Sequence, residues 1–331
     1  MSFLIQYTEF LLKLGTLVIA ILILAAGLFA IARKTKKHGK LKLSVKKLNK
    51  KYQELAETLN AEILTKSELK KWVKEKKIKA KKGNKQHKKR IFVLNFQGDI
   101  KGSAVNGLRE EITAILQVAT PQDEVVLKLE SGGGMVSPYG LAASQLKRLK
   151  DKGILLTVSI DKIAASGGYL MACVADKILA APFAIIGSIG VVAQLPNFHR
   201  FLKKKDIDFE LLTAGEYKRT LTMFGENTQK AREKTQDDLE EIHRLFKEFI
   251  KSNRKEINIA EVATGAHWLG KDALSLKLVD ELKTSDDYLT DQANNTRTNI
   301  YELQYLAKKT MSEKLSEKLT QIACSGLDLL K

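Results

Sequence analysis

The chain has 331 residues, a hydrophobic fraction of 44% and a formal net charge of +18. This length allows one sizeable globular domain with accessory segments and argues against many more domains. The two cysteines, Cys173 and Cys324, lie far apart in the sequence. They match neither a disulfide framework nor a metal-binding spacing, so we interpret them as small hydrophobic residues.

The positive charge is concentrated in one segment. Residues 33–90 contain 23 Lys and Arg against 5 Glu, so this segment alone accounts for the net charge of +18. The rest of the chain is neutral overall. Nucleic acid is therefore not expected as a partner, because the basic segment has few of the interleaved aromatic residues that stack on bases.

Residues 14–31, LGTLVIAILILAAGLFAI, carry no charge. About twenty such residues suffice to cross a bilayer as a helix, so we interpret residues 1–32 as a transmembrane anchor. A cleaved signal peptide is the alternative, because Ala30 and Ala32 form an A-x-A arrangement before Arg33. The length of the apolar stretch and the basic residues after it favour the retained anchor.

We interpret residues 33–90 as a basic juxtamembrane helical segment, whose lysines an anionic lipid surface would attract. Apolar residues recur in it at intervals of three to five, as in an amphipathic helix on a membrane or a partner. They are Leu48, Tyr52, Leu55, Leu59, Leu64, Leu69 and Trp72. A solvated charged linker with some helix is the alternative.

From Ile91 onward, short apolar runs alternate with segments of helical spacing. IFVLNF, EVVLKLE and ILLTVSI have the length and composition of buried strands. This alternation predicts an α/β fold with a mainly parallel sheet over residues 91–290. We also expect a long charged helix over 228–256 and a C-terminal helical tail over 291–331.

Residues 178–198 form a second uncharged run. Prolines and glycines, among them Pro182, Gly187 and Pro196, divide it into short pieces. Buried strands with turns are therefore predicted here instead of a second membrane span.

Ser166 follows a predicted strand, begins an apolar helical stretch and precedes Gly167 and Gly168. A nucleophilic serine needs small neighbours and a nearby N–H group for the developing oxyanion, and a helix start supplies such groups. Serine is also a common helix N-cap, so this pattern by itself is a weak signal.

The run LESGGGMVSPYG has the same form one strand earlier, with Ser131 before Gly132, Gly133 and Gly134. Adjacent glycines allow a backbone path closed to other residues and expose N–H groups. A phosphate-binding P-loop is disfavoured, because its lysine and following hydroxyl residue are missing. An oxyanion hole or a cradle for a peptide backbone fits better, and a tight structural turn is the alternative.

Activation of Ser166 requires a base. Of the five histidines, only His199 and His267 lie outside the basic segment and the charged helix, and neither has a supporting motif. A lysine can serve instead if burial lowers its pKa. The chain has too many lysines for spacing alone to select one.

Four blocks, AASGGYLMACVAD, GSIGVV, LLTAGEYKRTLTMFGENT and HWLGKDALSLKLVDEL, resemble in order and spacing the signal peptide peptidase A family of serine proteases. The resemblance covers about residues 90–290. It implies a Clp protease/crotonase-like fold and a serine endopeptidase without a cofactor or metal ion. It also implies Ser166 as the nucleophile, Lys218 as the general base and Ser188 as the residue that positions the lysine.

The resemblance further implies that Gly133, Gly134 and Gly167 supply oxyanion N–H groups or hold the substrate backbone. One position departs from the family: its usual loop is S-P-G-G, and Gly132 stands where proline is expected. Proline restricts the backbone, so the departure predicts a looser loop with reduced or partner-dependent activity.

The resemblance implies peptide or protein substrates, a homo-oligomer, and a single-pass protein of the bacterial inner membrane with a periplasmic catalytic domain. The positive-inside rule predicts a cytoplasmic domain instead, because ten Lys and Arg lie between residues 33 and 51. The orientation therefore stays open.

Two other functions stay open from the sequence. A crotonase-like enzyme acting on an acyl thioester would use the same glycine N–H groups, with carboxylates near the loop and no need for Ser166. A catalytically inert membrane scaffold would keep the basic segment and tolerate Gly132.

Overall fold

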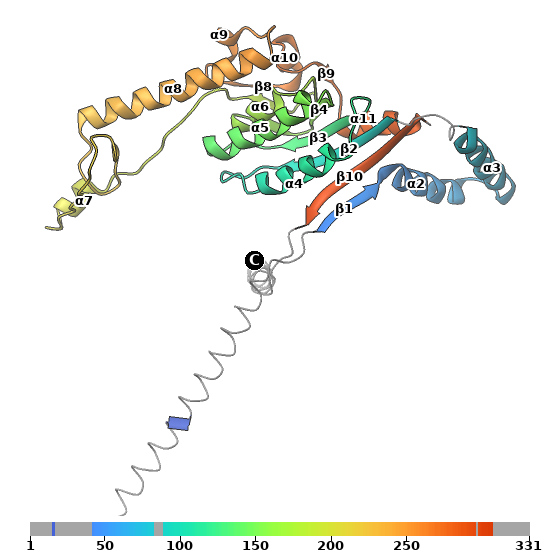
Figure 1. Cartoon of the computed structure of the whole chain (residues 1–331), viewed down its shortest axis with the longest axis horizontal. Coiled ribbons are helices and arrows are strands. Elements are labelled where there is room, and N and C mark those ends of the chain that lie inside the picture. Colours follow the sequence, from blue (N-terminus) through green and yellow to red (C-terminus); the bar gives the residue numbers. More distant parts are fainter. Residues whose placement is uncertain (1–14, 17–41, 83–88, 296, 307–331) are drawn as a thin grey trace, which may run out of the picture. The chain divides into compact units, whose positions relative to one another are not determined.

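The computed structural model describes residues 15–16, 42–82, 89–295 and 297–306 (Figure 1). The chain divides into two compact units, residues 1–44 with 305–331 and residues 45–304, and the second contains the candidate site. The anchor predicted over residues 1–32 lies outside the described residues, except for Gly15 and Thr16. Within the described ranges, no helix is both long and apolar enough to cross a membrane.

A seven-stranded sheet lies at the centre of the fold, with strand order β1-β10-β2-β3-β4-β6-β9. Each pairing from β10 through to β9 is parallel. The strands are β1 (Lys42–Lys47), β2 (Lys89–Gln97), β3 (Glu124–Glu130), β4 (Leu155–Ile160), β6 (Lys177–Ala180), β9 (Glu281–Leu282) and β10 (Thr298–Leu306). The predicted α/β fold with a mainly parallel sheet is confirmed, and the three apolar runs form β2, β3 and β4.

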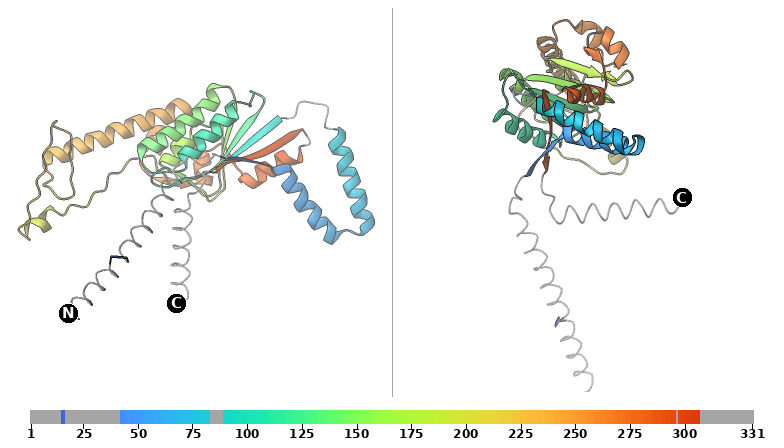
Figure 2. Two further views of the ribbon diagram at one scale, coloured as in Figure 1. Left: turned by 60° about the horizontal axis from the view of Figure 1, so that its bottom comes forward. Right: turned by 90° about the vertical axis from the view of Figure 1, so that its right-hand side faces the viewer.

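Helices cover both faces of this sheet (Figure 2). Phe92, Leu94 and Phe96 of β2 belong to the larger core with α4 (Val105–Leu116) and α5 (Val136–Asp151). Ile91 and Val93 belong to a smaller core with α2 (Leu48–Ile63) and α11 (Ser285–Asn294). Because side chains alternate along a strand, burial on both faces requires the continuous apolar run seen in the sequence.

The remaining helices are α3 (Lys66–Lys82), α6 (Gly167–Ala172), α7 (His199–Lys203), α8 (Gln229–Asn253), α9 (Ile259–Val262) and α10 (Gly270–Ser275). Helix α8 confirms the long charged helix expected over 228–256. Helices α2 and α3 lie within the basic segment, where the apolar spacing predicts helix.

A second, three-stranded sheet contains β5 (Ile163–Ala165), β7 (Ile185–Gly187) and β8 (His267–Leu269) in the order β5-β7-β8. Strands β5 and β7 are parallel, and β8 is antiparallel to β7. An isolated pairing of Ser131 with Ala164 connects the end of β3 to this sheet. The second uncharged run forms β6, β7 and the turns around them, as predicted.

The prediction of a helical tail over 291–331 is wrong at residues 298–306, because these residues form β10, which pairs with β2. Thr298, Ile300 and Leu303 of β10 are buried. Polar residues separate them, and Glu302 accepts a hydrogen bond from Asn95 of β2 at 3.0 Å. The strand therefore gains its stability from pairing with a segment about 200 residues earlier, which local spacing does not reveal. Residues 307–331 lie outside the described part of the chain.

Candidate active site

Ser166 occupies the turn between β5, which ends at Ala165, and α6, which begins at Gly167. Its backbone angles are φ 52° and ψ −120°, in a region that non-glycine residues avoid. Such a conformation costs on the order of 1–3 kcal/mol and persists only where the surroundings hold it. Here the Ser166 N–H donates to the Gly187 carbonyl at 2.7 Å, and the Ser166 carbonyl accepts from Leu170. Strain of this kind is typical of functional sites.

The glycine loop after β3 lies directly against this turn. A Cβ atom on Gly133 would lie 2.8 Å from Ser166 Cβ and 2.7 Å from the Gly167 nitrogen. Gly133 also has a φ of 89°. The loop is held in place because Ser131 N–H donates to the Ile163 carbonyl at 2.9 Å. Only glycine fits at position 133, and its backbone forms one wall beside Ser166.

The N–H groups of this region differ in their availability. Gly133 N–H, expected as a free donor, donates instead to Ser131 Oγ at 3.1 Å. The Gly134 and Gly167 N–H groups donate no hydrogen bond within the described part of the chain. Gly134, which is exposed, and Gly167, which is buried, therefore have N–H groups without a partner among the described residues.

Ser188 lies one residue beyond the carbonyl that holds Ser166. It also has a positive φ, 52°, and its N–H donates to the Ala266 carbonyl at 2.7 Å. At Gly187, a Cβ atom would lie 2.7 Å from the Trp268 ring of β8. Close packing of β7 against β8 thus fixes the backbone that leads to Ser188. The structure brings together Ser166, Ser188 and the glycine loop.

Lys218 lies elsewhere, in residues 191–228, which lie between β7 and α8 and are called the connecting segment below. Its side chain is exposed. The neighbouring residue Glu216 forms an ion pair with Lys230 in the first turn of α8. Figures 1 and 2 show that this segment runs from the core to α7, which lies near the amino-terminal end of α8.

The opposite end of α8 packs on the core, where Phe246 and Ile250 are buried. Along the helix axis, Lys230 and Phe246 lie roughly 24 Å apart. Among the described residues, no hydrogen bond or ion pair joins Lys218 to Ser166. The contacts of the described residues therefore do not connect the expected nucleophile with the expected base, whose side chain is exposed.

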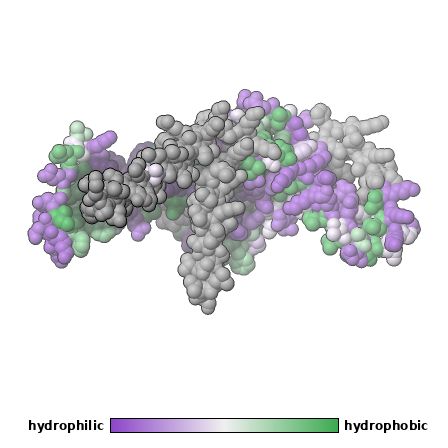
Figure 3. All heavy atoms as spheres, turned by 90° about the horizontal axis from the view of Figure 1, so that it is seen from below, coloured by the Kyte–Doolittle hydropathy of each residue, from purple (hydrophilic) through white to green (hydrophobic). Residues whose placement is uncertain are grey.

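The connecting segment exposes many large apolar side chains to solvent, and Leu212 is 92% exposed. The others are Val192, Leu195, Phe198, Phe201, Ile207, Phe209, Leu211, Tyr217, Met223 and Phe224. In Figure 3, hydrophobic residues (green) appear on the surface at the end where this segment lies. Exposed apolar surface of this kind is typical of regions that contact another protein, a membrane or a ligand.

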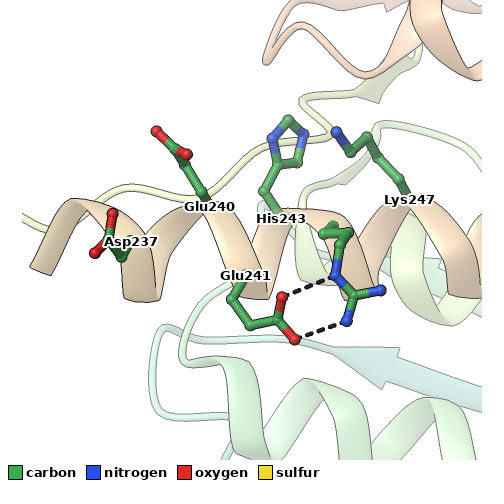
Figure 4. A pocket seen from close by; sticks show the side chains of 6 residues that line it. Asp237, Glu240, Glu241, His243 and Lys247 are labelled. Atoms are coloured by element: carbon green, nitrogen blue, oxygen red, sulfur yellow. Dashed lines mark hydrogen bonds and ion pairs between the residues drawn. The ribbon is translucent and has the colours of Figure 1, made fainter. Parts of the chain in front are cut away.

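A hollow on α8 is the remaining candidate, and Figure 4 shows its lining residues. All of them, Asp237, Glu240, Glu241, His243, Arg244 and Lys247, come from this one helix. Arg244 is already bonded to Glu241 through Nε and Nη2. In the parts of the chain that the structure describes, no cluster of three or more potential metal ligands occurs. The hollow contains no nucleophile and lies apart from the Ser166 turn in sequence.

His199 and His267 lie on α7 and β8, respectively. His267 pairs with Gly187 across β7 and β8, and its side chain is exposed. No hydrogen bond joins either histidine to Ser166 within the described ranges, so the structure adds no support for a histidine base.

The chain belongs to peptidase family S49. The pattern of this family matches residues 148–299, and that of its N-terminal region matches residues 2–146. The resemblance noted from the four sequence blocks is thereby confirmed, and it identifies the chain as a serine-type peptidase that acts on peptides or proteins.

Two relatives extend this match over nearly the whole chain. The probable protease SohB of Haemophilus influenzae is 47% identical, over 96% of this chain and 93% of that protein. The probable protease SohB of Buchnera aphidicola subsp. Schlechtendalia chinensis is 49% identical, over 87% of this chain and 99% of that protein. Within the family, the chain is therefore similar to SohB.

Proposed function

We propose that this chain is a membrane-anchored serine endopeptidase in which Ser166 is the nucleophile and Lys218 the general base. The observation that carries the proposal is the strained turn at Ser166, which lies directly against Gly133. The next N–H group, that of Gly167, has no hydrogen-bond partner among the described residues. N–H donors beside a nucleophile stabilise the oxyanion of acyl transfer, and strained backbone clusters at active sites.

In the proposed mechanism, the uncharged Lys218 amine removes the proton from the Ser166 hydroxyl, and Oγ attacks the scissile carbonyl. The Gly134 and Gly167 N–H groups stabilise the resulting oxyanion. The protonated lysine then passes its proton to the leaving amine, which yields an acyl-enzyme that water hydrolyses. Ser188, next to the carbonyl that holds Ser166, positions the lysine amine.

A lysine base must be uncharged, which requires its removal from water. In a single chain Lys218 is exposed, and Glu216, two residues before it, pairs with Lys230 in the first turn of α8. We therefore place the Lys218 of a second copy of the chain beside Ser166. The exposed apolar side chains of the connecting segment support such an assembly, because contact with a neighbour would bury them.

The membrane part of the proposal rests on the sequence. Residues 1–32 would anchor the chain in a bacterial inner membrane, and the basic residues of 33–90 would lie on anionic lipid. Leu55, Leu59 and Ile63 of α2 are exposed at helical spacing and would add apolar contact with such a surface.

Membership of a peptidase family favours the protease over the acyl-thioester enzyme and the inert scaffold. At Gly132, where the family has proline, the loop has room for a side chain. A Cβ atom at Gly132 would meet only Ile163 Cδ1, at 3.8 Å, and Gly132 has no positive φ.

The test uses full-length protein in detergent with a fluorescent casein substrate. Ser166→Ala and Lys218→Ala should each lower the cleavage rate by about 1,000-fold or more, with an unchanged circular dichroism spectrum. Full activity of Lys218→Ala would show that another group is the base.

Co-expression of the two inactive variants tests the second copy. In a random mixture, about one quarter of the sites would combine an intact Ser166 with an intact Lys218 from a neighbour, so about that share of activity should return. Two inactive variants that regain no activity in mixed assemblies would place nucleophile and base in the same chain.

A further inference from the structure

A series of three hydrogen bonds connects the glycine loop to the buried side chains of Ser131 and Tyr139. Gly133 N–H donates to Ser131 Oγ at 3.1 Å, Ser131 Oγ and the Tyr139 hydroxyl are 2.6 Å apart, and the Tyr139 hydroxyl donates to the Asp99 carbonyl at 2.9 Å. Because the outer two bonds have fixed donors, the Ser131 hydroxyl must donate to Tyr139. All three hydrogen bonds therefore have the same direction: each group donates to the next, from the Gly133 N–H to the Asp99 carbonyl.

The ring of Tyr139 and the backbone of Ser131 also lie close to the backbone that follows Ser166. A Cβ atom on Gly167 would lie 2.6 Å from Cγ of the Tyr139 ring, and one on Gly168 would lie 2.5 Å from the Ser131 carbonyl oxygen. Tyr139 is fully buried and Ser131 is 2% exposed. The Tyr139 ring is thus enclosed against the Gly167 backbone, with its hydroxyl 2.6 Å from Ser131 Oγ.

Three adjacent glycines make a flexible loop, and proline, which would restrict it, is replaced by Gly132. The Gly133 N–H bond to Ser131 fixes the peptide plane before Gly133. The direction of the next N–H group, that of Gly134, depends on this plane. The hydrogen-bonded chain thus restricts the loop at the residue after the missing proline.

We propose that Tyr139 and Ser131 are positioning residues for the oxyanion hole: their hydrogen bonds aim the Gly134 N–H, and the Tyr139 ring supports Gly167. This inference rests on the proposed protease function. Burial raises the pKa of the Tyr139 hydroxyl, so the hydroxyl stays protonated and continues to donate at alkaline pH.

Tyr139→Phe tests the inference, because it removes the hydroxyl and keeps the ring. In the full-length protein, kcat for peptide cleavage should fall about 10- to 100-fold, with KM within about twofold of wild type. Affinity for a peptide aldehyde, which forms a tetrahedral oxyanion adduct with serine, should fall by a similar factor. A purely structural role would not separate kcat from KM in this way.

Ser131→Ala provides the second variant, because it breaks the same chain one residue earlier. Since the two residues act through one chain, the double variant should be no worse than the more impaired single variant. If kcat of the double variant fell by the product of the two single-variant factors, the inference would be overturned.

Tyr288→Phe is the matched control. It removes another buried phenol hydroxyl, which donates to Glu124 Oε1 at 2.6 Å at the opposite, amino-terminal end of β3. Its kcat should equal that of wild type. Equal losses of kcat in Tyr139→Phe and Tyr288→Phe would overturn the positioning role.

Ser166→Ala separates the two proposals. If Ser166→Ala is inactive and Tyr139→Phe retains wild-type kcat, only the positioning role is overturned. If Ser166→Ala stays active, the protease mechanism itself fails.

Discussion

Gly132 and Gly133 are adjacent, yet an added methyl group would meet different surroundings at the two positions. At Gly133 it would lie within 2.9 Å of Gly167 N, Ser166 Cβ and the Ala165 carbonyl oxygen, on a backbone with a φ of 89°. At Gly132 it would lie 3.8 Å from a single side-chain atom. The loop therefore tolerates a side chain at one position and excludes it at the next.

Gly133→Ala should lower kcat/KM by about 100-fold, because the loop must move away from Ser166 and no longer aims its N–H groups. Gly132→Ala should stay within about twofold of wild type and serves as the control. Initial rates of peptide cleavage measure both. Equal activity of the two variants would contradict the close approach of Gly133 to the nucleophile.

The beginnings of β2 and β3 are joined by an ion pair between Arg90 and Asp123. Asp123 Oδ2 accepts from Arg90 Nη2 at 2.6 Å, and Asp123 also accepts from the N–H and hydroxyl of Thr120. Burial alone would raise the pKa of the Asp123 carboxyl, but these hydrogen bonds outweigh it and hold the pKa below its ordinary value. The carboxylate form of Asp123 thus stabilises the paired beginnings of β2 and β3.

Asp123→Asn should lower the free energy of unfolding by about 2 kcal/mol at pH 7. A lowered pKa in the folded state stabilises the protein above the unfolded value, about 3.9, and this contribution is lost as pH falls through the folded value. The difference between wild type and variant should therefore shrink below about pH 4. Chemical denaturation followed by circular dichroism measures it.

Asp151→Asn is the control for this pair, because Asp151 bonds Lys147 on the exposed surface of α5. Its effect should stay below about 0.5 kcal/mol. A stability difference for Asp123→Asn that stays constant down to pH 3 would contradict the role of the carboxylate.

Assembly is the property on which the proposed activity depends, and the connecting segment is its expected contact surface. Leu212→Asp places a charge at its most exposed apolar position. We expect the variant to lose self-association and peptide cleavage together, because charge opposes burial at an interface and Lys218 then stays in water. Sedimentation velocity in detergent and casein cleavage provide the two measurements.

Val118→Asp is the control, because Val118 is also exposed, 55%, but lies after α4 outside the connecting segment. It should leave both assembly and cleavage unchanged. A wild-type protein that is monomeric and fully active, or a Leu212→Asp variant that keeps both properties, would contradict the shared site.

Strands β2, β3 and β4 and helices α4, α5 and α8 could be predicted from the sequence, because their apolar spacing arises within about ten residues. Strand β10 could not. Its partner β2 lies about 200 residues away, and Glu302 and Gln304 give it a polar appearance until the pairing with β2 and the bond from Asn95 are known.

The site divides in the same way. The turn at Ser166 and the glycine loop could be recognised from strand, glycine and helix patterns, and the family resemblance selected Lys218 and Ser188. The bond of Gly133 to Ser131, the role of Tyr139 and the exposure of Lys218 could not be predicted. They depend on contacts between segments far apart in the chain, which local residue order does not specify. Local order determines each element, and packing between elements decides which N–H groups stay free and where a charged side chain lies.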